Sequence, residues 1–253
     1  MFKKRYNAIE ALKIMGNAPK QDLGPHIEVL LWNVFKCKRL GWQDDFERLI
    51  HSKDLILLQE AVLNSPFDRY FTQSKQYQWI MARSFKHLPS NIETGVKTGS
   101  VVAASKHYFS ASEHSEPFTK TKKMLLATAF PLNGQKQSLL VVNSHLINFV
   151  SFKKFKAHLD QIFETLENHD GPVLLAGDFN TWNTKRSNYF CAIARTFALE
   201  EVVLTRKTRL NHFFRHLDHI YCRGLKVVEA QVHTHIHSSD HFPISLTVST
   251  TVD

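Results

Sequence analysis

The sequence predicts a mixed α/β protein in which strands and helices are interspersed along one large domain. Roughly ten short apolar segments, bounded by glycine, proline or polar residues, have the length and composition of strands. Segments with helical spacing of apolar residues lie between them. Asn133-Gly134 stands between two apolar runs, which indicates an antiparallel hairpin. A wholly parallel sheet is therefore not expected.

The first half of the chain contains mainly strands. Residues 27–34 and 54–60 are almost continuously apolar, as is typical of strands buried on both faces. Between them, Phe46, Leu49 and Ile50 share one face of a helix. The expected elements are strands at 27–34, 54–60, 77–83, 100–105 and 125–132, a helix at 42–51, and a glycine-bearing loop at 94–99.

The second half adds two helices around a central strand. Residues 137–145 complete the hairpin, and the run 173–176 is the central buried strand. The clearest helix covers 152–168, with its apolar face formed by Phe152, Phe155, Leu159, Ile162, Phe163 and Leu166. A second helix is expected at 189–197, and strands at 217–221, 226–233 and 242–248.

The N-terminal segment is expected to be separate from this domain. We predict an appendage at residues 1–25 with a short helix over 8–15, and one domain at 26–253. The start of the chain lacks the apolar core of a signal peptide, and no run approaches the ~18 apolar residues of a membrane span. Cys37, Cys191 and Cys222 are too far apart for a metal-binding CxxC pair. A soluble, monomeric, cytoplasmic protein is the expectation.

The charge balance favours an anionic partner. Lysine and arginine total 32 against 23 acidic residues, which gives a net charge of +9. Nucleic acid, phosphorylated lipid and an acidic membrane surface all fit this excess. Basic residues cluster at Lys36, Lys38 and Arg39 and again at 120–123. A basic protein without such a partner would have the same net charge.

The stretch 172–183 is the first candidate for chemistry. Its apolar run ends at Gly177, where the backbone can turn or approach a neighbour closely. Asp178 and Asn180 then point to the same side of an extended segment. A carboxylate and a carboxamide placed together suit the holding of water, phosphate oxygens or a metal. An Asx-rich turn without any chemistry is the alternative reading.

Other polar residues follow or end apolar segments in the same way. Such a pattern is expected where one edge of a sheet carries a functional site. Each residue alone has a structural explanation, such as a turn or a surface acid, and only their joint occurrence favours a site. The set is Asn33, Glu60, Asn143, His145, Asp178, Asn180, Asp218, Asp240 and His241.

These residues carry a resemblance to the endonuclease/exonuclease/phosphatase family of metal-dependent phosphodiesterases. The matching pieces are Leu31-Trp32-Asn33-Val34, Leu57-Leu58-Gln59-Glu60, Thr98-Gly99, Asn143-Ser144-His145-Leu146, Gly177-Asp178-Phe179-Asn180, Leu217-Asp218-His219-Ile220 and Ser239-Asp240-His241-Phe242-Pro243. They occur in the family's order and span 31–243. Within the family, the chain most resembles a bacterial branch with which it shares longer stretches of identical residues around Asn33 and Asp178. The implied fold is a deoxyribonuclease I-like four-layer sandwich of two facing mixed sheets flanked by helices.

The resemblance also implies a role for each site residue. Glu60 would be the main metal ligand, with Asn33 and Asp240 near the same ion. Hard oxygen ligands suit Mg²⁺ or Mn²⁺, and the histidines lack the spacing of a zinc helix. Asp178 would activate water and Asn180 would hold phosphoryl oxygens.

Two histidines are candidates for proton transfer or stabilisation of the phosphate. His241 would be oriented by Asp218, and His145 matches a histidine of the deoxyribonuclease and sphingomyelinase branches. Either could protonate the leaving group. Asn143 is predicted to support this edge of the site and to contact substrate. Trp182 could stack on a base or sugar, or simply anchor its loop.

The implied function is a metal-dependent phosphodiester hydrolase, with a nuclease acting on DNA or RNA as the first choice. A phospholipid or inositol-phosphate phosphoesterase, similar to a sphingomyelinase, is the alternative. A non-catalytic nucleic-acid-binding module on the same scaffold is the second alternative, although every chemical position of the family is filled.

Overall fold

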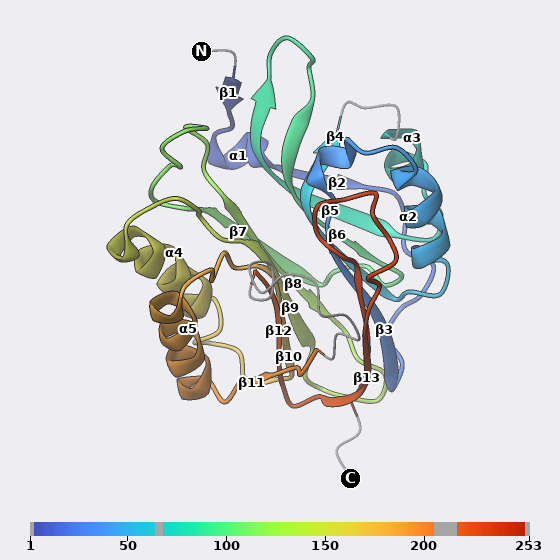
Figure 1. The fold of residues 1–253 in the computed structure, drawn as a ribbon. Coiled ribbons are helices and arrows are strands. Elements are labelled where there is room, and N and C mark those ends of the chain that lie inside the picture. Colours follow the sequence, from blue (N-terminus) through green and yellow to red (C-terminus); the bar gives the residue numbers. More distant parts are fainter. Residues whose placement is uncertain (1–2, 64–67, 205–216, 251–253) are drawn as a thin grey trace.

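Two facing sheets with helices on their outer faces form the fold (Figure 1). The computed structural model describes residues 3–63, 68–204 and 217–250. Helices α4 (Phe152–Glu164) and α5 (Thr184–Thr196) cover one sheet, and α2 (Trp42–Ile50) and α3 (Asp68–Thr72) flank the other. The predicted four-layer sandwich of mixed sheets is confirmed. Within these ranges no helix is long and apolar enough to cross a membrane.

Among the residues that the structure describes, the first sheet has eight strands, and β3 and β4 are its one parallel pair. Its order is β1 (Lys3–Arg5), β5 (Gln78–His87), β6 (Glu93–Ser100), β4 (Leu55–Leu63), β3 (His26–Asn33), β14 (Ile244–Ser249) and β13 (Lys226–Val232), and β2 (Leu12–Met15) also pairs with β5. A short 3-10 helix, η1 (Phe35–Cys37), follows β3 after Val34.

The described part of the second sheet has six strands, of which β9 and β10 are parallel. Its order is β11 (Glu200–Glu201), β12 (Asp218–Arg223), β10 (Val173–Asp178), β9 (Leu139–His145), β8 (Met124–Phe130) and β7 (Lys106–Ala111). The antiparallel pair predicted around Asn133-Gly134 is confirmed by β8 and β9. The connection between them is longer than a two-residue turn, because the ladder closes at Phe130 and Leu139.

The central strand β10 shows why its sequence is apolar without interruption. Leu174 and Ala176 belong to the core that includes the first sheet, whereas Val173 and Leu175 pack in the cluster under α4 and α5. Successive side chains of a strand point to opposite faces, and here both faces are covered. The helix α4 buries its predicted apolar face, including Phe155. It ends at Glu164, earlier than expected.

The predictions of a loop at 94–99 and of a strand at 100–105 are both wrong. Residues 94–99, expected to be a loop, lie in β6, and 100–105, expected to be a strand, connect β6 to β7. The glycines that suggested a loop serve close packing instead. A Cβ at Gly99 would lie 2.4 Å from the Trp79 ring, and one at Gly95 would lie 2.0 Å from the Ala82 carbonyl oxygen. Glycine in a strand can mark such a close approach.

The N-terminal segment extends the first sheet. The predicted helix over 8–15 is wrong beyond Ala11, because α1 (Ala8–Ala11) ends there and β2 pairs antiparallel with β5. Arg5 of β1 pairs with Phe85 of β5. The segment contributes hydrogen bonds to the sheet edge, and its separation from the domain at residue 25 stays a prediction.

Candidate active site

Polar side chains gather where strands of both sheets end at one edge. In the first sheet, Asn33 closes β3 and is paired in register with Gln59 of β4. In the second, Asp178 at the end of β10 lies between His145 of β9 and Asp218 of β12. Both parallel pairs deliver their carboxyl ends to the same edge, which explains how residues so distant in sequence meet.

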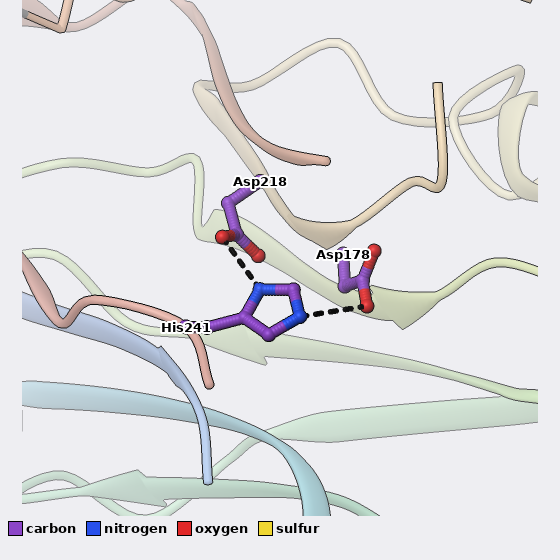
Figure 2. A group of neighbouring side chains, drawn as sticks. All are labelled: Asp178, Asp218 and His241. Carbon is purple, nitrogen blue, oxygen red and sulfur yellow. Dashed lines mark hydrogen bonds and ion pairs between the residues drawn. The ribbon is translucent and has the colours of Figure 1, made fainter. Parts of the chain in front are cut away.

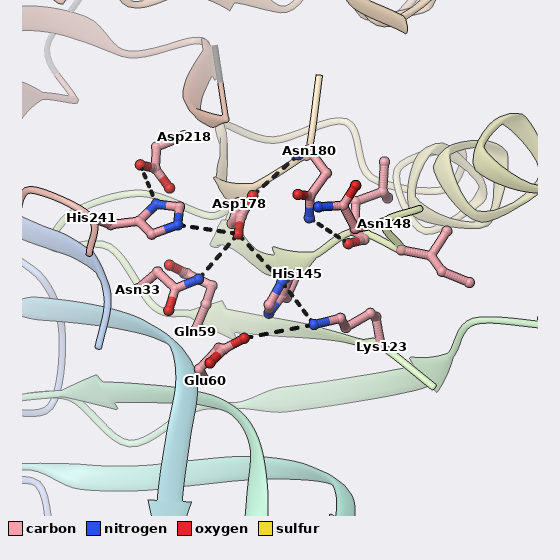
Figure 3. A network of polar contacts seen from close by, with 12 residues as sticks. Asn33, Gln59, Glu60, Lys123, His145, Asn148, Asp178, Asn180, Asp218 and His241 are labelled. Carbon is pink, nitrogen blue, oxygen red and sulfur yellow. Dashed lines mark hydrogen bonds and ion pairs between the residues drawn. The ribbon is translucent and has the colours of Figure 1, made fainter. Parts of the chain in front are cut away.

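Asp178 is at the centre of this group (Figure 3). Its Oδ2 accepts a hydrogen bond from Asn33 Nδ2 at 3.1 Å and lies 3.3 Å from His145 Nε2. Its Oδ1 accepts from the backbone N–H of Asn180 at 3.2 Å. Burial raises the pKa of Asp178 to about 6. Its carboxylate is therefore more basic than an ordinary aspartate.

Asn180 is fixed by its backbone and by two neighbours. Its φ of +51° is uncommon for a residue other than glycine, although asparagine tolerates it better than most. The Nδ2 donates to the Leu146 carbonyl at 2.9 Å, and the backbone carbonyl accepts from Arg186 Nη1 at 3.0 Å. Asn180 therefore reaches the site in one orientation.

His241 lies between two carboxylates (Figure 2). Asp218 Oδ2 is 2.8 Å from Nδ1, and Asp178 Oδ2 is 3.8 Å from Nε2. Burial alone would lower the pKa of His241, but the charge and hydrogen bond of Asp218 raise it to about 10. The second oxygen of Asp218 is buried without a hydrogen-bond partner among the residues described. Trp32 Nε1 donates to the His241 carbonyl at 3.0 Å and so holds the backbone.

His145 has the opposite electrostatic environment. Burial, followed by the positive charge of Lys123, holds the pKa of His145 well below its ordinary value. Lys123 Nζ lies 3.1 Å from His145 Nε2. Burial and Lys123 thus favour the neutral imidazole, whose Nε2 lies between the Lys123 ammonium and Asp178 Oδ2.

Glu60 projects from a bulge in β4. The register of β4 with β6 shifts between Leu58 and Ala61, and Glu60 has a φ of +51°. Its carboxylate contacts Lys36 Nζ and lies 3.8 Å from Lys123 Nζ (Figure 3). Burial would raise the pKa of Glu60, but the charges of Lys123 and Lys36 lower it. The side chain is therefore ionised and points to the same edge.

The predicted metal ligands fit a hard divalent cation by donor chemistry. Glu60, Asp240 and Asn33 line one pocket and offer carboxylate and amide oxygens. In this arrangement Asn33 Oδ1 accepts from the Phe35 N–H at 3.2 Å, and Glu60 is paired with lysines. An ion held here would therefore replace ammonium groups at Glu60.

A second group also has the geometry of metal ligands. One ligand atom from each of Asp178, Asp218 and His241 lies within 4.8 Å of the others. However, the hydrogen bond from imidazole to Asp218 already satisfies one nitrogen. A protonated imidazole offsets one of the two carboxylate charges, and its protonated nitrogens offer no lone pair to an ion until a proton is lost.

The pocket of about 580 Å³ brings together most of the predicted residues. Its volume lies in the range of small-molecule sites. Asp218 lies behind His241, to which it is bonded. The predicted residues that line the pocket are Asn33, Glu60, His145, Asp178, Asn180, Trp182, Asp240 and His241.

The predicted substrate contact of Asn143 is wrong. Asn143 is fully buried, and its Oδ1 accepts from Gln59 Nε2 at 2.7 Å. Its Nδ2 lies within hydrogen-bond distance of the carbonyls of Leu58 and Lys97 and of Thr98 Oγ1. All its polar atoms are used between the two sheets. Asn143 therefore supports the site from the interior between the two sheets and does not line the pocket.

Several residues of the pocket were not predicted as members of the site. Lys123 was expected only as a basic surface residue, but it joins Glu60, His145 and Glu116. Glu116 and Asn148 lie in loops without periodicity, where one sequence offers no signal for a site. In the sequence, the short spacing from His145 to Asn148 is the one hint that the loop of Asn148 lies at the same edge as His145.

Two facing mixed sheets with their polar strand ends at a common edge define the deoxyribonuclease I-like class of folds. Residues 30–241 match the model of the endonuclease/exonuclease/phosphatase family. The chain belongs to this family, whose members are hydrolytic phosphoesterases that generally use divalent metals. The resemblance seen in the sequence is confirmed.

Similar proteins agree with this assignment. A UPF0294 protein of Erwinia tasmaniensis is 34% identical over 224 residues, which cover 87% of this chain and 80% of that protein. An endonuclease/exonuclease/phosphatase from Beutenbergia cavernae has a TM-score of 0.69 at 15% identity, with 89% of this chain and 72% of that chain covered. The human Nocturnin catalytic domain with bound sulfate has a TM-score of 0.67 at 18% identity, with 95% and 97% covered. These two structures are similar in fold.

Proposed function

We propose that this protein is a metal-dependent phosphodiester hydrolase and that its substrate is nucleic acid. The observation that carries the proposal is the position of Asp178. Its buried carboxylate is held by Asn33 and faces His241, whose other nitrogen is held by Asp218. A base and an oriented imidazole side by side in one pocket are the groups that phosphodiester hydrolysis needs.

The divalent metal would be Mg²⁺ or Mn²⁺, and Glu60 would hold it together with Asn33 and Asp240. When bound, it supplies Lewis-acid neutralisation of the phosphate charge. The oxygen donor set supports this choice over zinc. Lys36 and Lys123, which pair with Glu60 in the structure, would then be available to the phosphate.

The chain's own residues carry the proton transfers. Asp178 accepts a proton from water as the water oxygen bonds to phosphorus. The P–O bond to the leaving group breaks, and that oxygen takes a proton from His241. Asn180 can donate the second hydrogen of its Nδ2 to a phosphoryl oxygen, since the first is donated to the Leu146 carbonyl.

The geometry supports His241 over His145 as the proton donor. His241 has one nitrogen anchored by Asp218 and the other directed toward Asp178. His145 instead lies against the ammonium of Lys123, which occupies its Nε2. His145 would position Asp178 and stabilise charge.

The net charge of +9 favours a polyanion over a small phosphoester. A phospholipid or inositol-phosphate phosphoesterase is the second candidate, favoured by the exposed Phe149 at the pocket. A non-catalytic binding module would have no need for a buried carboxylate held by Asn33 and by the Asn180 N–H.

Hydrolysis of bis-p-nitrophenyl phosphate with Mg²⁺ or Mn²⁺ tests the chemistry. We expect turnover that EDTA abolishes, and losses of at least about a hundredfold for Asp178→Asn, His241→Gln and Glu60→Gln. Asp22→Asn is the matched control, because Asp22 is half-buried away from the pocket and bonded to Asn133. Full activity of the Asp178 and Glu60 variants would refute the proposed site. Absence of turnover with every metal would favour the binding module.

A panel of substrates then tests the substrate class. Plasmid nicking and oligonucleotide cleavage are expected to exceed release of phosphate from inositol phosphates or of phosphocholine from sphingomyelin. The reverse order would replace nucleic acid by lipid as the substrate.

A further inference from the structure

Three exposed aromatic side chains stand at the mouth of the pocket. Phe118 is 82% exposed, Phe149 65% and Trp182 49%. Phe149 and Trp182 line the pocket, together with Thr119, the neighbour of Phe118. The rings of Phe118 and Phe149 meet edge to face, with their centroids 6.0 Å apart. We call Phe118, Phe149 and Trp182 the aromatic rim. Large apolar groups gathered in water beside a polar site commonly mark a binding surface.

The aromatic rim is held in place by Asn148. The Oδ1 of Asn148 accepts hydrogen bonds from Trp182 Nε1 at 2.9 Å and from the Phe149 N–H at 2.8 Å. Phe149 has a φ of +53°, a conformation that a bulky residue rarely adopts. One amide oxygen therefore fixes two aromatic residues from different loops. Arg186, itself buried, lies 4.7 Å from the centre of the Trp182 ring and supports its inner side.

Glu116 connects the rim to the candidate active site. Its carboxylate is buried and accepts from the Asn148 N–H at 3.1 Å and from Thr119 Oγ1 at 2.9 Å. The loop of Phe118 and the loop of Phe149 are thereby bonded to the same side chain. Lys123 lies 3.5 Å from Glu116 and 3.8 Å from Glu60. The aromatic faces therefore have a defined position relative to the groups proposed to act on phosphate.

We propose that the aromatic rim stacks on the unpaired bases of single-stranded nucleic acid while the phosphodiester lies in the pocket. This inference rests on the proposed function. Aromatic side chains stack on any base, but in a duplex the base faces already stack on one another. Lys123 and Lys36 beside Glu60 provide positive charge for the backbone. Aromatic faces with adjacent lysines are the combination that binds single strands.

The same exposed rings could contact a lipid surface, but the rim favours bases. The rings stand at the mouth of the pocket, so a strand whose phosphodiester lies in the pocket brings its neighbouring bases directly to them. The two phenylalanine rings meet edge to face and are 82% and 65% exposed, so ring faces stay open to a flat base.

Binding of fluorescent oligonucleotides by the full chain, measured by anisotropy in EDTA to prevent cleavage, tests this inference. A labelled twelve-nucleotide thymidylate strand is compared with a duplex of equal length. We expect the single strand to bind at least tenfold more tightly. Phe118→Ala and Phe149→Ala should each weaken its binding between five- and a hundredfold, and the double variant more. Phe118→Tyr should retain most of the affinity, because the stacking face remains.

Tyr108→Ala is the matched control, since Tyr108 is an exposed aromatic residue on β7 that lines a different pocket. It should bind the strand like the wild type. Equal affinity of the wild type for strand and duplex, or rim variants that bind like the wild type, would overturn the inference. Reduced binding of the rim variants to phosphatidylserine vesicles, with unchanged oligonucleotide binding, would replace bases by lipid.

Hydrolysis of bis-p-nitrophenyl phosphate by the wild-type protein separates this inference from the proposed function. Turnover without preference for single strands refutes the inference alone. Strand binding that depends on the rim, without turnover under any metal, refutes the hydrolase and supports the rim as a binding site.

Discussion

Gly177 shows how a single residue sets the position of Asp178. The sequence suggested that the backbone turns or approaches a neighbour at this glycine. The structure shows a close approach, because a Cβ at this position would lie 1.9 Å from the Ser144 carbonyl oxygen of β9. Its φ of +156° is also one that other residues rarely adopt. The parallel pairing of β9 and β10 next to the site therefore requires glycine.

Gly177→Ala should force the two strands apart at this point. We expect a loss of about 3 kcal/mol in the free energy of unfolding, measured by urea denaturation, together with a loss of hydrolysis. Gly24→Ala is the control, because its added Cβ would have no neighbour nearer than 3.9 Å. A Gly177→Ala protein as stable as the wild type would show that the strands can separate without cost.

His158 of α4 makes stability depend on pH. It is fully buried, its Nδ1 accepts from the Ile147 N–H at 3.1 Å, and burial lowers its pKa to about 3. An unfolded histidine titrates near 6.5. Between pH 3 and 6.5 the unfolded state therefore binds more protons, and stability falls as the pH decreases through this window.

His158→Asn removes this titration and can retain an acceptor for the Ile147 N–H. The variant should be less stable at pH 7.5, because it leaves a cavity. The difference in the free energy of unfolding between wild type and variant should shrink by about 3 kcal/mol from pH 7.5 to pH 4.5. Urea denaturation at both pH values measures it, with His51→Asn, at an exposed site, as control. A difference that does not change with pH would mean that His158 is not held neutral.

At the scale of elements, the amides of Gln59 and Asn143 join the two sheets. Both are fully buried and bond to each other across the interface between β4 and β9. The sequence placed both at strand ends near the site, but it could not show which side chains would face the pocket. That choice depends on how the second sheet packs on the first.

Asn143→Ala should destabilise the sandwich more than an active-site substitution would. It leaves Gln59 Nε2 and the carbonyls of Leu58 and Lys97 without this partner. A cost of about 3 kcal/mol in thermal or urea unfolding follows, since buried polar groups lose their hydrogen bonds. Asn133→Ala, in an exposed turn, should stay within about 0.5 kcal/mol of the wild type. Equal effects of the two substitutions would contradict this role.

Whether a helix or strand could be predicted from the sequence depended on how continuously its faces are buried. The central strand and α4 could be predicted because one or both faces are continuously covered by core. The strand β6 was missed because its glycines are set by Trp79 and Ala82, residues of a neighbouring strand. The site residues were found through motif and family resemblance, and their geometry agrees with one pocket. The loops of Glu116 and Asn148 could not be predicted, because only tertiary contacts bring them there.

At the scale of the whole molecule, the net charge of +9 adds a long-range contribution to the local contacts of the pocket. Positive charge attracts a polyanion before any specific contact forms. It also predicts counterion release when phosphates are neutralised by lysine and arginine. A small substrate with a single negative charge would release few counterions.

Oligonucleotide binding should therefore depend strongly on salt, whereas hydrolysis of bis-p-nitrophenyl phosphate should not. If four phosphates are contacted, affinity for a single strand should fall about fiftyfold between 50 and 200 mM salt. KM for the small substrate should change by less than about threefold, because its single charge has few counterions to release. Anisotropy titrations and initial rates at the same salt concentrations measure both. Lys36→Gln and Lys123→Gln should each reduce the salt slope, since these side chains lie beside the proposed phosphate site. Affinity independent of salt would mean that the basic surface does not contact the nucleic-acid backbone.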